Sequence, residues 1–248
     1  MKQTMVTTLR QLRLSGLAST LEVRFQEAAA NRLSHEEFLE LLLQDELTVR
    51  KNRLIARRLT LGGFRDQKTL EDFDWSFNPA VKSKPIFELS TGRFITAAQD
   101  VLFIGPPGVG KSHLVQAIGQ QAVRLGFTVL YRSIFDLARE FLRDEDLAGE
   151  DKVLVSYLKP DLLIIDDMGM KQLVKRSGEF LLEVVMRRHE NRATMMTSNR
   201  PIEEWGKLIG DIPAATAILD RFLQRATIIT LTGKSYRLKN RACKTSEN

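Results

Sequence analysis

Apolar and polar positions follow two different spacings along the chain, and the change from one to the other comes near residue 100. Beyond that point, short apolar runs alternate with segments in which apolar residues recur every three to four positions. The short runs are typical of buried strands and the longer spacing is typical of helices. Their alternation predicts an α/β fold in which helices wrap a parallel sheet. We predict five strands, at Val101–Ile104, Thr128–Tyr131, Leu162–Ile165, Thr194–Thr197 and Thr227–Leu231.

The N-terminal part of the chain shows helical spacing alone. A first helix is indicated by apolar residues that share one face, Leu14, Leu17, Leu21 and Phe25. Ser34 and Glu37 have the spacing of a capping box ahead of a second helix, which ends near Gly62. We predict a small all-helical domain over residues 1–67. Its leucines form either an internal core or a surface for oligomerisation or partner binding.

Length and composition support one larger domain after this helical one. The chain has 248 residues, of which 43% are hydrophobic, and this is enough for a packed core. We place an α/β domain at 68–233, including a connector rich in acidic, aromatic and turn residues, and a basic tail at 234–248. No apolar stretch is long enough to span a bilayer, and no apolar signal region follows Met1. A cytoplasmic protein is therefore expected, and the single Cys243 predicts neither disulfides nor a zinc site.

Positive charge is concentrated in a few segments. The formal net charge is +6, and basic residues cluster at 50–58, at 171–176 and in the tail. Such clusters favour a polyanionic partner, although solvated faces are the alternative. We expect a nucleic acid, bound through its phosphates with little sequence preference. The candidate DNA-binding residues are Lys171, Lys175 and Arg176.

A glycine-rich segment between the first predicted strand and the following helix fits the GxxxxGK[ST] pattern of a phosphate loop. Its glycines let the backbone wrap phosphate groups at the N-terminus of a helix, where the helix dipole favours an anion. Lys111 is predicted to reach the β- and γ-phosphates of ATP, and Ser112 to bind Mg²⁺. The predicted nucleotide contacts are Gly105, Pro106, Pro107, Gly108, Val109, Gly110, Lys111, Ser112 and the next residue, His113.

Two aspartates follow the third predicted strand and complement this loop. Mg²⁺ that bridges two phosphates needs a hard oxygen ligand from the end of a neighbouring strand, and Asp166 is placed to supply it. Asp167 is the candidate for the group that positions or polarises the attacking water. Its side chain is one methylene shorter than the glutamate usual there, so the rate of hydrolysis stays open. Taken alone, an Asp pair is also common in strand-end turns.

The local sequence leaves the roles of two further polar residues open. Asn199 follows the fourth predicted strand, where it either orients the attacking water or forms an Asn-Arg-Pro turn. Arg221 lies on an amphipathic segment before the last strand, and a lone arginine there is most often a surface ion-pair residue.

Several motifs together resemble the IstB family, the transposition helper ATPases of bacterial insertion sequences. They are Leu102–Gly119, Asp166–Gly169, Thr197–Pro201 with Trp205, Ala217–Arg221 and Gly233–Arg237, and weaker similarity extends over residues 37–53 and 68–73. The resemblance implies an AAA+ three-layer ATPase of the branch that contains the helicase loaders DnaC and DnaI, without a substantial C-terminal lid. It also implies that Asn199 is the first sensor, that Arg221 is an arginine finger and that Arg237 is a further phosphate sensor.

The family resemblance implies an ATP-dependent helper that forms a ring or spiral around duplex DNA and activates a partner transposase. An arginine finger acts on the nucleotide of a neighbouring protomer, so ATP and DNA are expected to promote this assembly. The chemistry of the sequence also allows a replicative helicase loader. A structural DNA-binding module in which ATP is hardly hydrolysed is a third reading. A small-molecule kinase is disfavoured, because no acceptor motif is found.

Overall fold

The computed structural model describes residues 2–144, 150–168, 175–206 and 212–239. It divides into two compact units, the N-terminal unit (1–58) and the sheet unit (59–248). The division falls inside helix α3, so a single helix runs from one unit into the other. The boundaries expected from sequence at residues 67 and 233 stay predictions.

The N-terminal unit consists of α1 (Lys2–Gln11), α2 (Ser15–Asn31) and most of α3 (His35–Gly62). Its core is small, with Leu17, Leu21 and Leu42 buried together. The predicted capping box is present, because the N–H of Ser34 donates to Glu37 Oε2 at 2.7 Å and that of Glu37 donates to Ser34 Oγ at 3.2 Å. α1 was not expected as a separate helix.

The leucines of α3 divide between the inside and the outside of the N-terminal unit. Leu42 is 5% exposed, whereas Leu39 and Leu43 are about half exposed. Glu46 is buried on the same helix and accepts hydrogen bonds from the N–H groups of Gly16 and Leu17 at 2.6 and 3.2 Å. These bonds satisfy backbone donors in the first turn of α2, which an α-helix leaves unpaired.

The sheet unit is built on five parallel strands in the order β2-β3-β4-β1-β5. All five predicted strands are present, with ends that differ by no more than three residues from those expected. Their bounds are β1 (Asp100–Ile104), β2 (Val129–Ser133), β3 (Leu162–Met168), β4 (Ala193–Ser198) and β5 (Ala226–Thr230). The first four are almost wholly buried, and β5 is an exposed edge strand.

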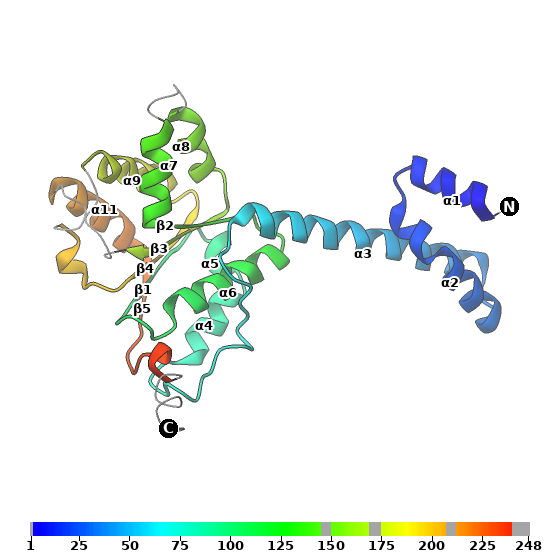
Figure 1. Ribbon diagram of the computed structural model, residues 1–248, viewed down its shortest axis with the longest axis horizontal. Helices are drawn as coiled ribbons and strands as arrows, with labels where there is room; N and C mark the ends of the chain where they lie inside the picture. Colours follow the sequence, from blue (N-terminus) through cyan, green and yellow to red (C-terminus); the bar gives the residue numbers. More distant parts are fainter. Residues whose placement is uncertain (1, 145–149, 169–174, 207–211, 240–248) are drawn as a thin grey trace, which may run out of the picture. The chain divides into compact units, whose positions relative to one another are not determined.

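Helices cover both faces of this sheet and give the expected three layers (Figure 1). One face carries α4 (Ser83–Ser90), α5 (Arg93–Thr96) and α6 (Lys111–Arg124). The other face carries α7 (Ile134–Asp144), α8 (Glu150–Leu158), α9 (Lys175–Arg188) and α11 (Ile212–Gln224). A short 3₁₀ turn, η2 (Ile202–Glu204), follows β4. Among the residues described after β5, helical structure is limited to one turn at 236–239.

Asp100, at the start of β1, makes the folding stability of the sheet unit depend on pH. Its Oδ1 accepts a hydrogen bond from the N–H of Thr194 at 2.7 Å. Burial raises the pKa of Asp100 to about 7, against the opposing effects of that bond and of Arg188 and Arg225. The folded state therefore retains this proton at a pH where the unfolded chain has lost it. The stabilisation of the folded state by protonated Asp100 is complete below the ordinary pKa of 3.8 and is lost as the pH rises to 7.

Asp100→Asn cannot titrate and should remove this dependence. We expect the free energy of unfolding of the wild type, relative to the variant, to decrease by roughly 3 kcal/mol between pH 5 and pH 8. Urea unfolding of both proteins at the two pH values measures this difference. Parallel pH dependences in the two proteins would contradict the assignment.

Candidate functional site

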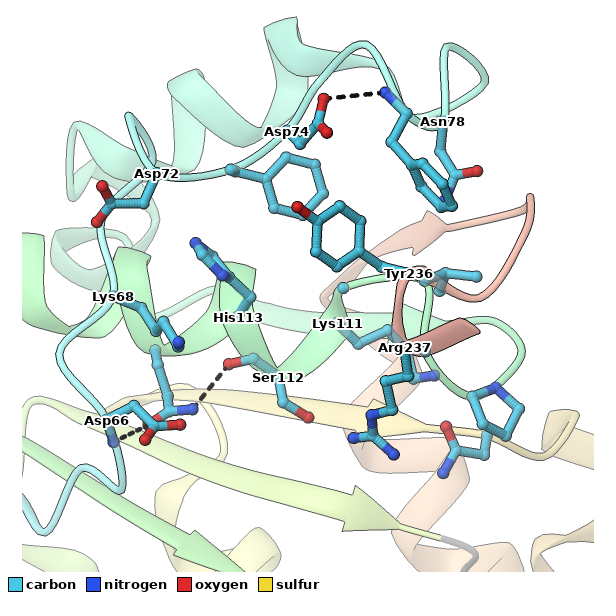
Figure 2. Close-up of a pocket in the computed structure, with 18 of the residues that line it drawn as sticks. Asp66, Lys68, Asp72, Asp74, Asn78, Lys111, Ser112, His113, Tyr236 and Arg237 are labelled. Atoms are coloured by element: carbon cyan, nitrogen blue, oxygen red, sulfur yellow. Dashed lines mark hydrogen bonds between the residues drawn. The ribbon is translucent and has the colours of Figure 1, made fainter. Parts of the chain in front are cut away.

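A cavity of about 310 Å³ opens at the carboxyl ends of the strands, beside the predicted phosphate loop (Figure 2). Three parts of the sheet unit form its walls. They are the connector between α3 and α4, the loop with the start of α6, and the segment after β5. Two more polar residues line the cavity, Asp167 on β3 and Asn199, which directly follows β4. The connector contributes Asp66, Lys68, Asp72, Phe73, Asp74, Phe77 and Asn78, and the last segment contributes Tyr236 and Arg237.

The loop joins β1 to α6 and needs glycine where other chain segments approach it. Gly108 and Gly110 have φ of +83° and +103°, which side chains rarely adopt. A Cβ at Gly108 would also lie 2.0 Å from Ser235 Oγ, and one at Gly110 would lie 2.5 Å from the ring of Phe73. The loop leads directly into the N-terminus of α6 at Lys111. This arrangement directs backbone N–H groups and the positive end of a helix toward an anion.

Lys111 is folded into the loop. Its Nζ donates to the carbonyl oxygens of Gly105 and Pro106 at 2.6 and 2.9 Å. Burial lowers the pKa of Lys111 to about 8, and the charges of Asp166 and Asp167 oppose that change. A bound phosphate adds negative charge and therefore favours the protonated lysine still further.

Asp166 is fully buried at the centre of a hydrogen-bond network. Its Oδ2 accepts from the hydroxyl of Tyr131 on β2 at 2.6 Å. Its Oδ1 accepts from the hydroxyl of Thr197 on β4 and from Ser112 Oγ at 3.2 Å. The strands on both sides of β3 therefore hold this carboxylate, and it lies next to the serine at the start of α6.

Asp167 has an unusual backbone and a charged neighbour. Its φ is +64°, at an irregularity between Ile165 and Met168 where β3 pairs with β4. Its N–H donates to Asp166 Oδ1 and to Thr197 Oγ1, each at 3.0 Å. Burial and the charge of Asp166 raise the pKa of Asp167, and Arg65 is the first of three cations that lower it. Arg65 Nη1 lies 3.6 Å from Asp167 Oδ2.

Hydrogen bonds to the phosphate loop and to the connector hold the segment after β5 in place. The N–H of Tyr236 donates to the carbonyl of Gly108 at 2.9 Å. Asn78 accepts from the N–H of Lys234 and donates to its carbonyl, both at 3.0 Å. These contacts bring Arg237 to the wall of the cavity beside Lys111 (Figure 2). His113, on the connector side, has its Nε2 2.8 Å from the carbonyl oxygen of Thr69.

Comparison with known proteins identifies the family of the chain. The family model described as IstB-like ATP binding protein matches residues 7–244. The chain belongs to this IstB family. It is 35% identical over 97% of its length to an insertion sequence IS5376 putative ATP-binding protein of Geobacillus stearothermophilus, covering 96% of that protein. It is 33% identical over 94% of its length to an insertion sequence IS21 putative ATP-binding protein of Pseudomonas aeruginosa, covering 88% of it.

Solved structures give the fold of this IstB protein independently. The crystal structure of DnaI aligns with a TM-score of 0.58 and 22% identity, over 67% of this chain and 92% of that one. DnaA bound to AMPPCP and single-stranded DNA aligns with a TM-score of 0.57 and 19% identity, over 75% of this chain and 56% of that one. At such identities the likeness shows the AAA+ fold alone, and it confirms the fold class expected from the sequence.

The structure brings most of the predicted site residues of this IstB protein together, with exceptions. Asn199 and Arg237 line the cavity with the loop. Arg221 does not, because it is exposed on α11 and lines a different hollow with residues of the same helix. Of the candidate DNA contacts, Lys171 and the side chain of Lys175 lie outside the described residues. Arg176 is exposed, in a hollow that also contains Glu179 and Glu183.

Other residues of the site escaped prediction from sequence. Tyr131 and Thr197 hold Asp166, and their role depends on which strands flank β3. The connector was expected to lead into the domain, yet Phe73 and Phe77 form a wall of the cavity. Its density of aromatic and acidic residues was the available signal, because such residues are unusual in a plain linker.

Proposed function

We propose that this IstB protein binds ATP with Mg²⁺ and hydrolyses it to ADP and phosphate. The observation that carries the proposal is the proximity of Ser112 Oγ and Asp166 Oδ1, 3.2 Å apart beside a glycine loop at the start of a helix. A hydroxyl and a carboxylate are hard oxygen ligands, which Mg²⁺ prefers. Within the described residues, no group of three or more acidic, histidine or cysteine side chains could hold a metal. This is consistent with an ion that completes its coordination with substrate phosphates and water.

In this proposal, each residue of the site has a separate role. The loop N–H groups and Lys111 bind the β- and γ-phosphates, Ser112 and Asp166 hold Mg²⁺, and Arg237 is a further phosphate contact. Mg²⁺ held by Ser112 and Asp166 would neutralise charge that develops on the phosphates. Asp167 orients a water and accepts its proton as the water oxygen bonds to the γ-phosphorus and the bond to the β,γ-bridging oxygen breaks. Asn199 helps to orient that water from the end of β4.

We further propose that ATP joins protomers through Arg221. This arginine is exposed and lies outside the cavity of its own chain. A guanidinium placed on the γ-phosphate of a neighbouring protomer would both stabilise the transferring group and hold the two chains together. A ring or spiral of this kind could surround duplex DNA. Its contacts to phosphates would give weak sequence preference and a strong dependence on salt.

Arg221→Ala tests the role of the exposed arginine. ATP affinity should be unchanged, whereas assembly with ATP and duplex DNA should need about tenfold more protein, as one lost interfacial charge contact implies. Sedimentation over a protein concentration series gives the midpoint of assembly, and Arg139→Ala on the exposed face of α7 is a matched control. If the Arg221 variant assembles and hydrolyses ATP like the wild type, the role between protomers is wrong.

The biological role that we propose is that of a helper that marks target DNA and recruits a transposase. The relatives encoded in insertion sequences support it, and they span almost the full chain. A pull-down with the transposase encoded beside the gene, against one with the replicative helicase, separates this role from that of a loader. The rate of ATP hydrolysis, measured with and without duplex DNA, distinguishes an ATPase from a structural module. The structural module would bind ATP for assembly and hardly hydrolyse it.

For the membrane, the described part of the chain contains no helix that is both long and apolar enough to cross a bilayer. We propose a cytoplasmic location, where a transposition helper would meet its target DNA.

A further inference from the structure

Residues 62–66, which run from the last residue of α3 to the first residue that lines the cavity, are anchored to the phosphate-loop helix. We call them the junction segment. Gln116 on α6 accepts from the N–H groups of Arg65 and Asp66 at 3.0 and 3.1 Å. Gln120 donates to the carbonyl of Asp66 at 2.8 Å. Both glutamines are buried, so this end of α3 has a defined position in the sheet unit.

The junction segment also packs against β2, the strand that pairs with the acidic strand β3. The ring of Phe64 stacks on Tyr131, with the two centroids 6.0 Å apart. It also lies over Gly119, where an added Cβ would come within 2.8 Å of it. Tyr131 in turn donates to Asp166. The packing of Phe64 therefore fixes the neighbouring Arg65 beside β3.

Arg65 makes two ionic contacts from this anchored backbone. Its Nη2 donates to Asp136 Oδ2 on α7 at 3.3 Å, and its Nη1 lies 3.6 Å from Asp167 Oδ2. Asp136 is itself fixed by hydrogen bonds from the N–H and hydroxyl of Ser133. Asp167 lines the cavity, whereas Arg65 is not among the lining residues and pairs with this carboxylate from the junction segment.

We propose that Arg65 is a positioning residue for hydrolysis, which keeps the carboxylate of Asp167 directed at the attacking water. This inference rests on the proposed ATPase function. Asp167 has a short side chain and lies on an irregular part of β3. Its backbone N–H is held by hydrogen bonds to two side-chain oxygens. These bonds leave χ1 of Asp167 to be set by other contacts. The ion pair with Arg65 is such a contact. An ion pair as exposed as this one contributes little to folding stability, yet a small misplacement of a reacting group slows a reaction considerably.

Arg65→Ala should lower kcat roughly tenfold, while KM and the affinity for a non-hydrolysable ATP analogue stay near wild type. Arg65→Lys keeps a cation at this place and should recover part of the lost rate. Arg139→Ala, on the exposed face of α7, is the matched control and should behave like the wild type. Thermal melting of each variant confirms that the fold is retained.

A double-variant cycle distinguishes positioning from a general structural effect. In the Asp167→Asn background, Arg65→Ala should cause little further loss of kcat, because the group that it positions is already inactive. Equal tenfold losses in both backgrounds, or an Arg65→Ala protein that hydrolyses ATP at the wild-type rate or faster, would overturn the inference. The proposed function fails separately, if the wild type does not hydrolyse ATP or if Asp167→Asn alone has no effect.

Discussion

Lys111→Ala is expected to weaken ATP binding by about 100-fold or more. The ammonium group of Lys111 lies inside the phosphate loop, where it can donate charge-assisted hydrogen bonds to two phosphates. Each such bond contributes roughly 1.5–3 kcal/mol, so losing two corresponds to at least two orders of magnitude in affinity. Isothermal titration with a non-hydrolysable ATP analogue and Mg²⁺ measures the change.

A matched control separates this local effect from general loss of charge. Lys159→Ala removes a lysine that is exposed just before β3, and it should bind the analogue like the wild type. Both variants should remain folded, because Lys111 donates within its own loop to carbonyls that water can also satisfy. Wild-type affinity in Lys111→Ala would remove the central support for a nucleotide site in this cavity.

Asp167→Asn is expected to slow hydrolysis about 10³-fold while leaving analogue affinity within a few-fold of wild type. The amide has the size of the carboxylate but cannot accept the proton of the attacking water, and general base catalysis contributes about 10²–10⁴ to a rate. Steady-state phosphate release with saturating ATP gives kcat, and analogue titration gives the affinity.

Asparagine is the suitable replacement because of the backbone conformation of Asp167. With φ at +64°, Asp167 occupies a conformation that asparagine adopts readily and alanine does not. Asp167→Ala is therefore expected to lose thermal stability as well as activity, whereas Asp167→Asn should melt close to the wild type. If Asp167→Asn hydrolyses ATP normally, another group activates the water.

Local patterns were sufficient to predict the sheet, the phosphate loop and the paired aspartates. A buried strand such as β1 is a continuous apolar run, and the residues of the loop are contiguous, so each can be recognised without knowledge of the fold. The family resemblance then supplied Asn199 and Arg237, and the structure places both at the cavity. Arg221 also came from the resemblance, and its role between protomers stays a prediction.

Residues that act through tertiary neighbours could not be predicted in this way. Tyr131 contacts Asp166 because β2 pairs with β3, and Thr197 does so because β4 pairs on the other side. Neither pairing follows from the order of strands along the chain. Arg65 was missed for the same reason, since more than a hundred positions separate it from Asp167. The leucines of the helical domain were expected to form either an internal core or an exposed surface, and α3 does both, because Leu42 is buried while Leu39 and Leu43 are exposed.

The strand order also has a consequence for biosynthesis. β1, which leads into the phosphate loop, pairs with β4 and β5, and Val101 lies opposite Met195 and Thr227. These partners emerge from the ribosome more than ninety residues after β1. Pairings between distant segments form late because they require closure of a long loop. A nascent chain interrupted before β4 therefore leaves β1, a highly apolar strand, without either of its partners, which makes such truncated products candidates for aggregation or for capture by chaperones.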